Sequence, residues 1–110
     1  MIDWTRVAEL RGEIGAEDFD EVAELFLMEV EDTLSQLNDA VNDAPQMQEL
    51  MHFLKGSALN LGFADLSDMC SKGEENAGNE QINVDIASLK NLYAQSRALF
   101  ETEYAQRFAA

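Results

Sequence analysis

The chain has 110 residues, and 46% of them are hydrophobic. It contains one cysteine and carries a formal net charge of −15. This length suits a single compact domain over residues 1–110, and the apolar fraction is enough to build a core. The negative charge disfavours binding to nucleic acid or to anionic membrane surfaces, because both need clustered Lys and Arg. No apolar run approaches the ~20 residues of a membrane span, and one cysteine cannot form an internal disulfide, so we expect a cytoplasmic protein.

The first two predicted helices lie in the acidic part of the chain. A short segment begins at Asp3, a residue type that caps helix N-termini, and ends between Gly12 and Gly15. A long helix follows, with mostly acidic residues at its exposed positions. Its apolar residues recur at steps of three and four: Phe19, Val22, Phe26, Val30, Leu34, Leu37 and Val41.

Three further helices are expected after a break at residues 42–45. Pro45 suits the first turn of the third helix, which should end near Gly62. The fourth helix should start near Asp65, and the last should begin after Asp85 as its cap. The residues expected to face the core are Leu50, Leu54, Ser57, Ala58 and Leu61, then Leu66, Met69, Cys70, Gly73 and Ala77, and finally Ile86, Leu89, Tyr93, Ser96, Phe100 and Tyr104.

The pattern contains no convincing strand, no internal repeat and no domain linker. Four amphipathic helices joined by short loops pack best as an antiparallel bundle. The short first helix would then cover one end of that bundle. The sequence therefore predicts an all-α fold, an antiparallel four-helix bundle with a short N-terminal capping helix.

The only histidine lies in the least charged stretch of the chain. Residues 48–64 contain one carboxylate and one lysine, whereas the charged residues of 9–49 are acidic with one exception. A buried helix would also be uncharged. The low charge therefore indicates a functional surface only if the side of the helix that carries His52 is exposed. At about 100° per residue, Leu50 and Leu54 lie opposite His52. If these two leucines face the core, the imidazole faces solvent.

The side of the third helix around His52 has an unusual composition for a solvated surface. Lys55 lies one turn on, and Gly56 in mid-helix should cost ~1 kcal/mol relative to Ala. Packing cannot offset that cost on an exposed face, whereas the close approach of a partner would explain it. Exposed apolar residues nearby would also indicate a surface that binds another protein. We therefore predict a partner-binding surface around His52 composed of Gln48, Gly56, Leu59 and Phe63.

Residues 52–62, His-Phe-Leu-Lys-Gly-Ser-Ala-Leu-Asn-Leu-Gly, resemble the signature H-x-L-K-G-S-S-x-x-L-G of histidine-containing phosphotransfer (HPt) domains. Ala58 departs from it, because the family usually has a second serine there, and we expect a packing change at that position. Gly73 stands where a larger apolar residue is common. The resemblance covers nearly the whole chain, and three downstream residues match the usual L…C…E spacing: Leu66, Cys70 and Glu74.

This resemblance implies a phosphorelay intermediate of two-component signalling. His52 would accept a phosphoryl group from the aspartate of a response-regulator receiver domain, or from a hybrid sensor kinase acting through one, and pass it to another receiver. Lys55 would stabilise charge on the phosphoryl oxygens, and Gly56 would leave room for the receiver. Ser57, bonded to a preceding backbone carbonyl, and Gly62 would support the structure.

The resemblance also sets expectations about cofactors and partners. We expect no metal and no cofactor on this chain, with Mg²⁺ on the partner receiver domain. The sequence has no glycine-rich phosphate loop, so we expect an ATP-independent carrier without kinase activity of its own. We also expect a monomer that binds neither nucleic acid nor a membrane.

Two other classes of function fit part of the sequence. A helical bundle that docks a receiver and only regulates it needs the same surface, yet not an imidazole beside a lysine. An acidic mimic of nucleic acid would explain the charge of −15 but not the neutral face. We interpret the carboxylates of Glu74 and Glu75 as solvated charge, and Cys70 as a buried hydrophobe rather than a reactive thiol.

Overall fold

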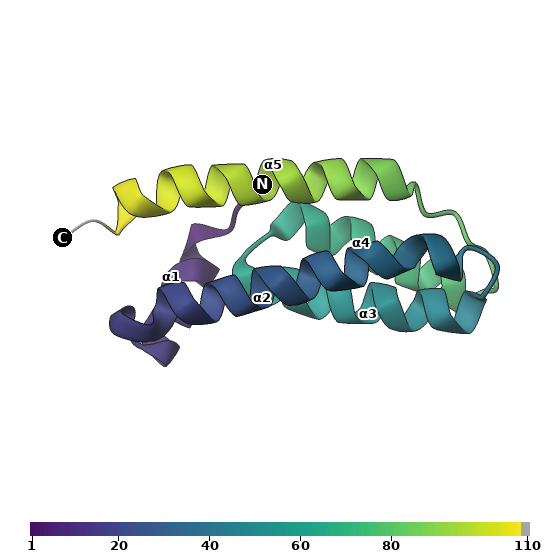
Figure 1. Cartoon of the computed structure of the whole chain (residues 1–110), viewed down its shortest axis with the longest axis horizontal. Helices are drawn as coiled ribbons and strands as arrows, with labels where there is room; N and C mark the ends of the chain where they lie inside the picture. The colour runs from purple at the N-terminus through teal and green to yellow at the C-terminus, as the bar shows by residue number, and fades with distance from the viewer. Residues whose placement is uncertain (109–110) are drawn as a thin grey trace.

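The computed structural model describes residues 1–108, whose fold is built from helices joined by short turns (Figure 1). The helices α2 to α5 run side by side in an elongated bundle of 48 × 22 × 20 Å, and α1 packs against one end. Within these residues there is no strand, only an isolated bridge between Ile2 and Phe63. The predicted all-α bundle is confirmed, with α1 (Trp4–Ile14), α2 (Ala16–Gln36), α3 (Ala44–Leu61), α4 (Ala64–Gly78) and α5 (Ile86–Arg107).

Three helices, α1, α3 and α5, begin at an aspartate cap, and α3 ends at a glycine. Asp3, Asp43 and Asp85 each accept a backbone N–H from the residue three positions on, at 3.0–3.2 Å. Gly62 ends α3 with a φ of 76°, a left-handed conformation that favours glycine. A side chain there would also meet the carbonyl oxygen of Asp3 at 2.6 Å. The predicted caps at Asp3 and Asp85 and the predicted helix end at Gly62 are confirmed.

The apolar stripe predicted for the long helix is buried at Phe19, Val30, Leu34 and Leu37, but in the middle of α2 the buried face lies one residue further along. Ala23 and Leu27 are buried, whereas Val22 and Phe26 are only half-buried. A 3-10 turn at Leu37–Ala40 then changes the direction of the chain, which leaves Val41 exposed. Two neighbouring apolar stripes on this helix both follow the three- and four-residue spacing of a helix. The spacing alone therefore does not predict which stripe is buried. Of the apolar repeat, Val22 and Phe26 are therefore only partly buried and Val41 is exposed.

Phe63 lies in the core and not on the surface around His52. The predicted position assumed that α3 continues to residue 63, but Gly62 reverses the chain first. Phe63 is fully buried, with its ring centroid 5.7 Å from that of Phe100 and 6.4 Å from that of Tyr93. Its prediction as a partner-binding residue was wrong, and so was the prediction of a buried Met69, which is exposed on α4.

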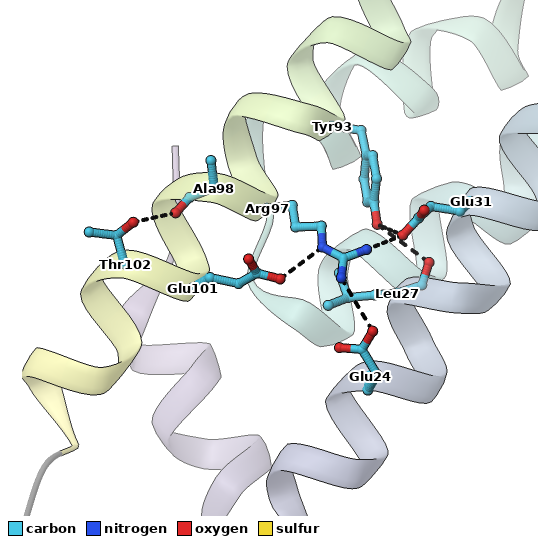
Figure 2. A network of polar contacts seen from close by, with 8 residues as sticks. All are labelled: Glu24, Leu27, Glu31, Tyr93, Arg97, Ala98, Glu101 and Thr102. Atoms are coloured by element: carbon cyan, nitrogen blue, oxygen red, sulfur yellow. Dashed lines mark hydrogen bonds and ion pairs between the residues drawn. The ribbon is translucent and has the colours of Figure 1, made fainter.

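A polar network fastens α5 to α2 (Figure 2). Arg97 of α5 pairs with Glu24 of α2 at 3.2 Å, with Glu31 of α2, and with Glu101 of its own helix at 2.8 Å. The hydroxyl of Tyr93 donates to Glu31 at 2.8 Å. Burial, followed by the contact with Glu31, raises the pKa of this hydroxyl, so it remains a donor. Several charges that share one guanidinium hold α5 in register more firmly than isolated surface pairs would.

Aromatic side chains attach α1 to the end of α5. The ring of Trp4 stacks on that of Phe100 with centroids 6.0 Å apart and planes 4° apart. The guanidinium of Arg107 lies over the same indole, 4.6 Å from the centroid. The short first helix thus covers one end of the bundle as predicted. Among residues 1–108, no helix is long and apolar enough to cross a membrane.

Candidate functional site

His52 projects from the outer side of α3. Leu50 and Leu54, two residues away on either side, are buried in the bundle, and the His52 side chain is 70% exposed. Because α3 is a regular helix through this region, the angular positions predicted from the sequence hold here. The predicted exposure of the imidazole is confirmed.

A carboxylate of α4 contacts the imidazole from the neighbouring helix. Oε1 of Glu74 lies 2.8 Å from Nδ1 of His52, and Oε2 of the same carboxylate lies 2.6 Å from Nζ of Lys55. The Glu74 side chain is 20% exposed and that of Lys55 29% exposed. One carboxylate thus joins the two side chains that the sequence placed on a common face of α3.

The environment of Glu74 keeps it ionised. The hydrogen bond from Lys55 is the main cause that lowers the pKa of Glu74, and the contact with His52 adds to it, while partial burial opposes both. An ionised carboxylate accepts hydrogen bonds only, so its contact at Nδ1 favours the neutral imidazole tautomer with the proton on Nδ1. In that tautomer Nε2 keeps its lone pair.

The interpretation of Glu74 as solvated charge was wrong. The chain reverses at Gly62, and His52 lies ten residues before it whereas Glu74 lies twelve after it. Two antiparallel helices folded about that glycine bring these positions level, at about 1.5 Å of rise per residue. This symmetry about the turn is the signal in the sequence that could have placed Glu74 beside the histidine.

A shallow groove of about 320 Å³ begins beside His52 and is shared by α3 and α2. Phe53, Gly56 and Asn60 line it from α3, while Phe26 and Glu29 line it from α2. The two α2 residues were not recognised as site residues from the sequence. Phe26 belongs to the apolar repeat but is only half-buried, and Glu29 is an exposed carboxylate one turn on.

The other predicted surface residues lie at different places around the histidine. Apart from the adjoining backbone of α3, a Cβ at Gly56 would have no described atom within 4 Å, so the space above this glycine is open. Leu59 is 54% exposed. Gln48 is exposed, with its side-chain amide against Gly78, and with Lys55 and Glu74 it lines a hollow of about 550 Å³. The structure therefore keeps Gln48, Gly56 and Leu59 accessible.

Two side chains of the motif region point into the bundle. Ser57 and Cys70 are both buried, as their helical positions predicted. Burial raises the pKa of the Cys70 thiol to about 12, so it stays protonated and unreactive at neutral pH. The proposed hydrogen bond from the Ser57 hydroxyl to the backbone stays a prediction.

The Hpt domain family matches the chain over residues 21–99, a range that includes His52, Lys55 and Glu74. The chain belongs to the Hpt domain family. It serves histidine phosphotransfer in a phosphorelay of two-component signalling.

The fold of this Hpt domain is similar to a solved structure of the same type. The crystal structure of histidine-containing phosphotransfer protein B (HptB) from Pseudomonas aeruginosa PAO1 matches with a TM-score of 0.84 and 26% sequence identity. The similarity covers 97% of this chain and 96% of that one. No curated protein matches the chain. Hpt domains are phosphotransfer carriers that interact with receiver domains and kinases.

Proposed function

We propose that His52 is the phosphoacceptor of this Hpt domain and that Nε2 is its reacting atom. The observation that carries the proposal is the contact of Glu74 with Nδ1, on a side chain that is 70% exposed. The carboxylate orients the ring from one side and holds the proton on Nδ1, so the opposite nitrogen is both accessible and unprotonated. An exposed nucleophile is what transfer between two protein surfaces requires.

The proposed step exchanges one bond to phosphorus for another. The lone pair of Nε2 forms an N–P bond with the phosphoryl group of a receiver's phospho-aspartate. The P–O bond to the aspartate breaks, and its electron pair leaves with the carboxylate. The imidazole becomes cationic and keeps its proton on Nδ1, where Glu74 balances the new positive charge. Transfer to a second receiver follows the same path in reverse.

Lys55 and Gly56 assist this step in different ways. Lys55 contributes a positive charge beside the reacting ring, where negative charge spreads over the phosphoryl oxygens. Gly56 leaves the space above α3 open for the receiver's active-site loops. We propose that the docking surface comprises Gln48, Gly56 and Leu59 together with Phe26 and Glu29 from α2.

We also propose partners, a source of Mg²⁺ and a cellular location for this chain. The partners are response-regulator receiver domains and a hybrid sensor kinase, and the receiver supplies Mg²⁺, which neutralises phosphoryl charge when bound. We propose that the chain itself is a monomeric cytoplasmic carrier without kinase activity. Its single cysteine suits a reducing compartment, and its charge of −15 suits a protein partner rather than nucleic acid.

A receiver-docking module that only regulates its partner is the alternative. Such a module would use the same exposed surface of α3 and α2. It would have no need for a carboxylate that orients an imidazole from a second helix. The contact between Glu74 and His52 therefore favours the carrier.

Mass spectrometry after mixing with phosphorylated receiver domains separates the two functions. The carrier should gain one phosphoryl group, and because phosphohistidine is acid-labile, acid should remove it. His52→Gln should abolish the gain while changing the stability by less than ~0.5 kcal/mol, since the side chain is exposed. Labelling of the His52→Gln variant would refute the assignment, because the chain has no other histidine.

A further inference from the structure

Gly73 faces Met51 at the contact between α3 and α4, the most closely packed pair of helices in the bundle. A Cβ at position 73 would lie 2.8 Å from Sδ and 3.2 Å from Cγ of Met51, and 3.3 Å from Cγ2 of Val84. The first distance is shorter than any carbon–sulfur contact in a packed protein. Even one methyl group at this position therefore requires a displacement.

The packing around Met51 limits which atoms can move to make room for that methyl group. Met51 is fully buried, so its thioether has no solvent to move into. The clashing atoms lie in the middle of the methionine side chain and not only at its flexible end. Packed interiors transmit such strain instead of absorbing it. A different Met51 rotamer would need free volume in this packed core, so we expect a wider separation of α3 and α4 to relieve the clash.

The two contacting residues stand immediately before the two residues that meet in the site. Met51 precedes His52 on α3, and Gly73 precedes Glu74 on α4. The spacing between the helices at the first pair therefore sets the distance available to the second pair. The contacts of Glu74 with His52 and Lys55 measure 2.8 and 2.6 Å, and a hydrogen bond is lost beyond about 3.5 Å. A separation by less than 1 Å is enough to break them.

We propose that Gly73 is a positioning residue for phosphoryl transfer. By presenting no side chain to Met51, it permits the helix spacing at which Glu74 reaches both His52 and Lys55. Met51 fills the volume that a side chain at position 73 would need, so methionine and glycine form a matched pair. This inference rests on the proposed role of His52.

Gly73→Ala tests the proposal with two readouts. The transfer rate at saturating phosphorylated receiver should fall by ~10- to 100-fold, because misplacement by about 1 Å has effects of this size. Affinity for the unphosphorylated receiver should change little, since the docking surface lies on the outer side of α3 and on α2. The ¹⁵N signals of the only histidine should shift from the tautomer protonated on Nδ1 toward that protonated on Nε2.

Gly12→Ala is the matched control. Gly12 is an exposed helical glycine of α1, and a Cβ there would meet no atom of the described residues within 4 Å. This variant changes the same residue type in a helix without touching the contact between α3 and α4. Its transfer rate and histidine signals should equal those of the wild type.

A double variant distinguishes positioning from general destabilisation. Met51→Ala removes the two closest atoms that a Cβ at position 73 would meet and leaves only Cγ2 of Val84, at 3.3 Å. Met51→Ala combined with Gly73→Ala should therefore recover most of the lost rate and the wild-type histidine signals. The double variant should nevertheless unfold more readily than the wild type, because it lacks a buried methionine. A merely structural role of Gly73 predicts the opposite order, with transfer falling as stability falls.

The possible outcomes separate this inference from the proposed function. Wild-type transfer and histidine signals in Gly73→Ala would overturn the positioning role, and so would a double variant that folds but transfers no better than the single one. If Gly73→Ala fails to fold, recovery of both folding and transfer in the double variant supports the inference. Only labelling of His52→Gln would overturn the phosphoacceptor assignment itself.

Discussion

At the level of single residues, Glu74 links the two side chains of α3 to which we assign phosphoryl transfer. One oxygen contacts Nδ1 of His52 and the other contacts Nζ of Lys55. The carboxylate therefore orients the imidazole and also holds the ammonium beside it. Changes at Glu74 should affect the ring tautomer as well as the local charge, and these two effects can be measured separately.

Glu74→Gln should slow phosphoryl transfer by ~10- to 100-fold, by analogy with the loss of the group that orients a metal-ligating histidine. A glutamine amide can donate to Nδ1 and so favour a proton on Nε2, which removes the nucleophilic lone pair. Transfer kinetics together with ¹⁵N signals of the histidine check this expectation. An unchanged rate with a changed tautomer would show that the tautomer does not limit the reaction.

The lowered pKa of Glu74 also predicts how the stability difference between the wild type and Glu74→Gln depends on pH. Lys55, and to a lesser degree His52, lower the pKa of Glu74 below its ordinary value of 4.5. A carboxyl group with a depressed pKa stabilises the folded state above its unfolded value and loses that contribution as the pH falls through the folded value. The wild type should therefore be more stable than Glu74→Gln at neutral pH, and the difference should shrink below pH 4.5 in denaturant titrations.

Gly56→Leu should separate stability from transfer. A side chain at this position enters open space, so the variant should gain up to ~1 kcal/mol from better helix propensity. The same side chain would stand between the receiver and His52, and the transfer rate should fall by about 100-fold or more. Thermal unfolding and transfer measured on one preparation check both parts, with Gly12→Leu on exposed α1 as the control. Normal transfer by a stabilised Gly56→Leu would mean that the receiver docks elsewhere.

At the level of helices, α2 contributes more than one face to the molecule. Its buried stripe includes Ala23 and Leu27, and its half-buried edge includes Phe26, which lines the groove beside His52. Leu25 and Met28 are exposed next to that edge. The broad apolar surface of α2 thus serves the core on one side and the proposed docking surface on the other.

The helix α5 buries a polar group in its core-facing side. The Ser96 hydroxyl is fully buried, and it has no hydrogen-bond partner among residues 1–108. Ser96→Ala should therefore raise the free energy of unfolding by ~1 kcal/mol, because it removes an unpaired polar atom and improves helix propensity. Thr102→Ala is the control on the same helix, since Thr102 is exposed and its hydroxyl donates to the Ala98 carbonyl at 2.8 Å (Figure 2).

Chemical denaturation of Ser96→Ala and Thr102→Ala measures how much each substitution changes the free energy of unfolding. Both substitutions improve helix propensity by a similar amount, so a larger gain at Ser96 reports the cost of the buried hydroxyl. Ser96→Ala that is less stable than the wild type would show that the hydroxyl has a partner in solution, such as a buried water molecule.

At the level of the whole molecule, the family match and the full fold differ in extent. The Hpt match spans residues 21–99, which begins within α2 and ends within α5. The aromatic contacts of Trp4 with Phe100 and of Arg107 with Trp4 lie at the end of the bundle where α1 and α5 meet. The aromatic side chains at this end continue into the core through Phe100 and Phe63, whereas His52 lies on the outer side of α3 within the matched region.

Local chemistry in the sequence determined the helices and the exposure of His52. A helical repeat of 3.6 residues places Leu50 and Leu54 opposite His52 whatever the helix packs against. The aspartate caps and the glycine at position 62 likewise act within a few residues of themselves, and they set the helix ends. These features follow from one segment at a time, so the amino-acid sequence was sufficient to predict them.

Only the tertiary structure decided which residues of different helices meet. The reversal at Gly62 turned Phe63 into the core, and the packing of α4 on α3 brought Glu74 to the histidine. The separation of those two helices depends on the contact between Met51 and Gly73. No periodicity within a single helix contains an interhelical distance, because that distance is set by side chains that come from both helices at once.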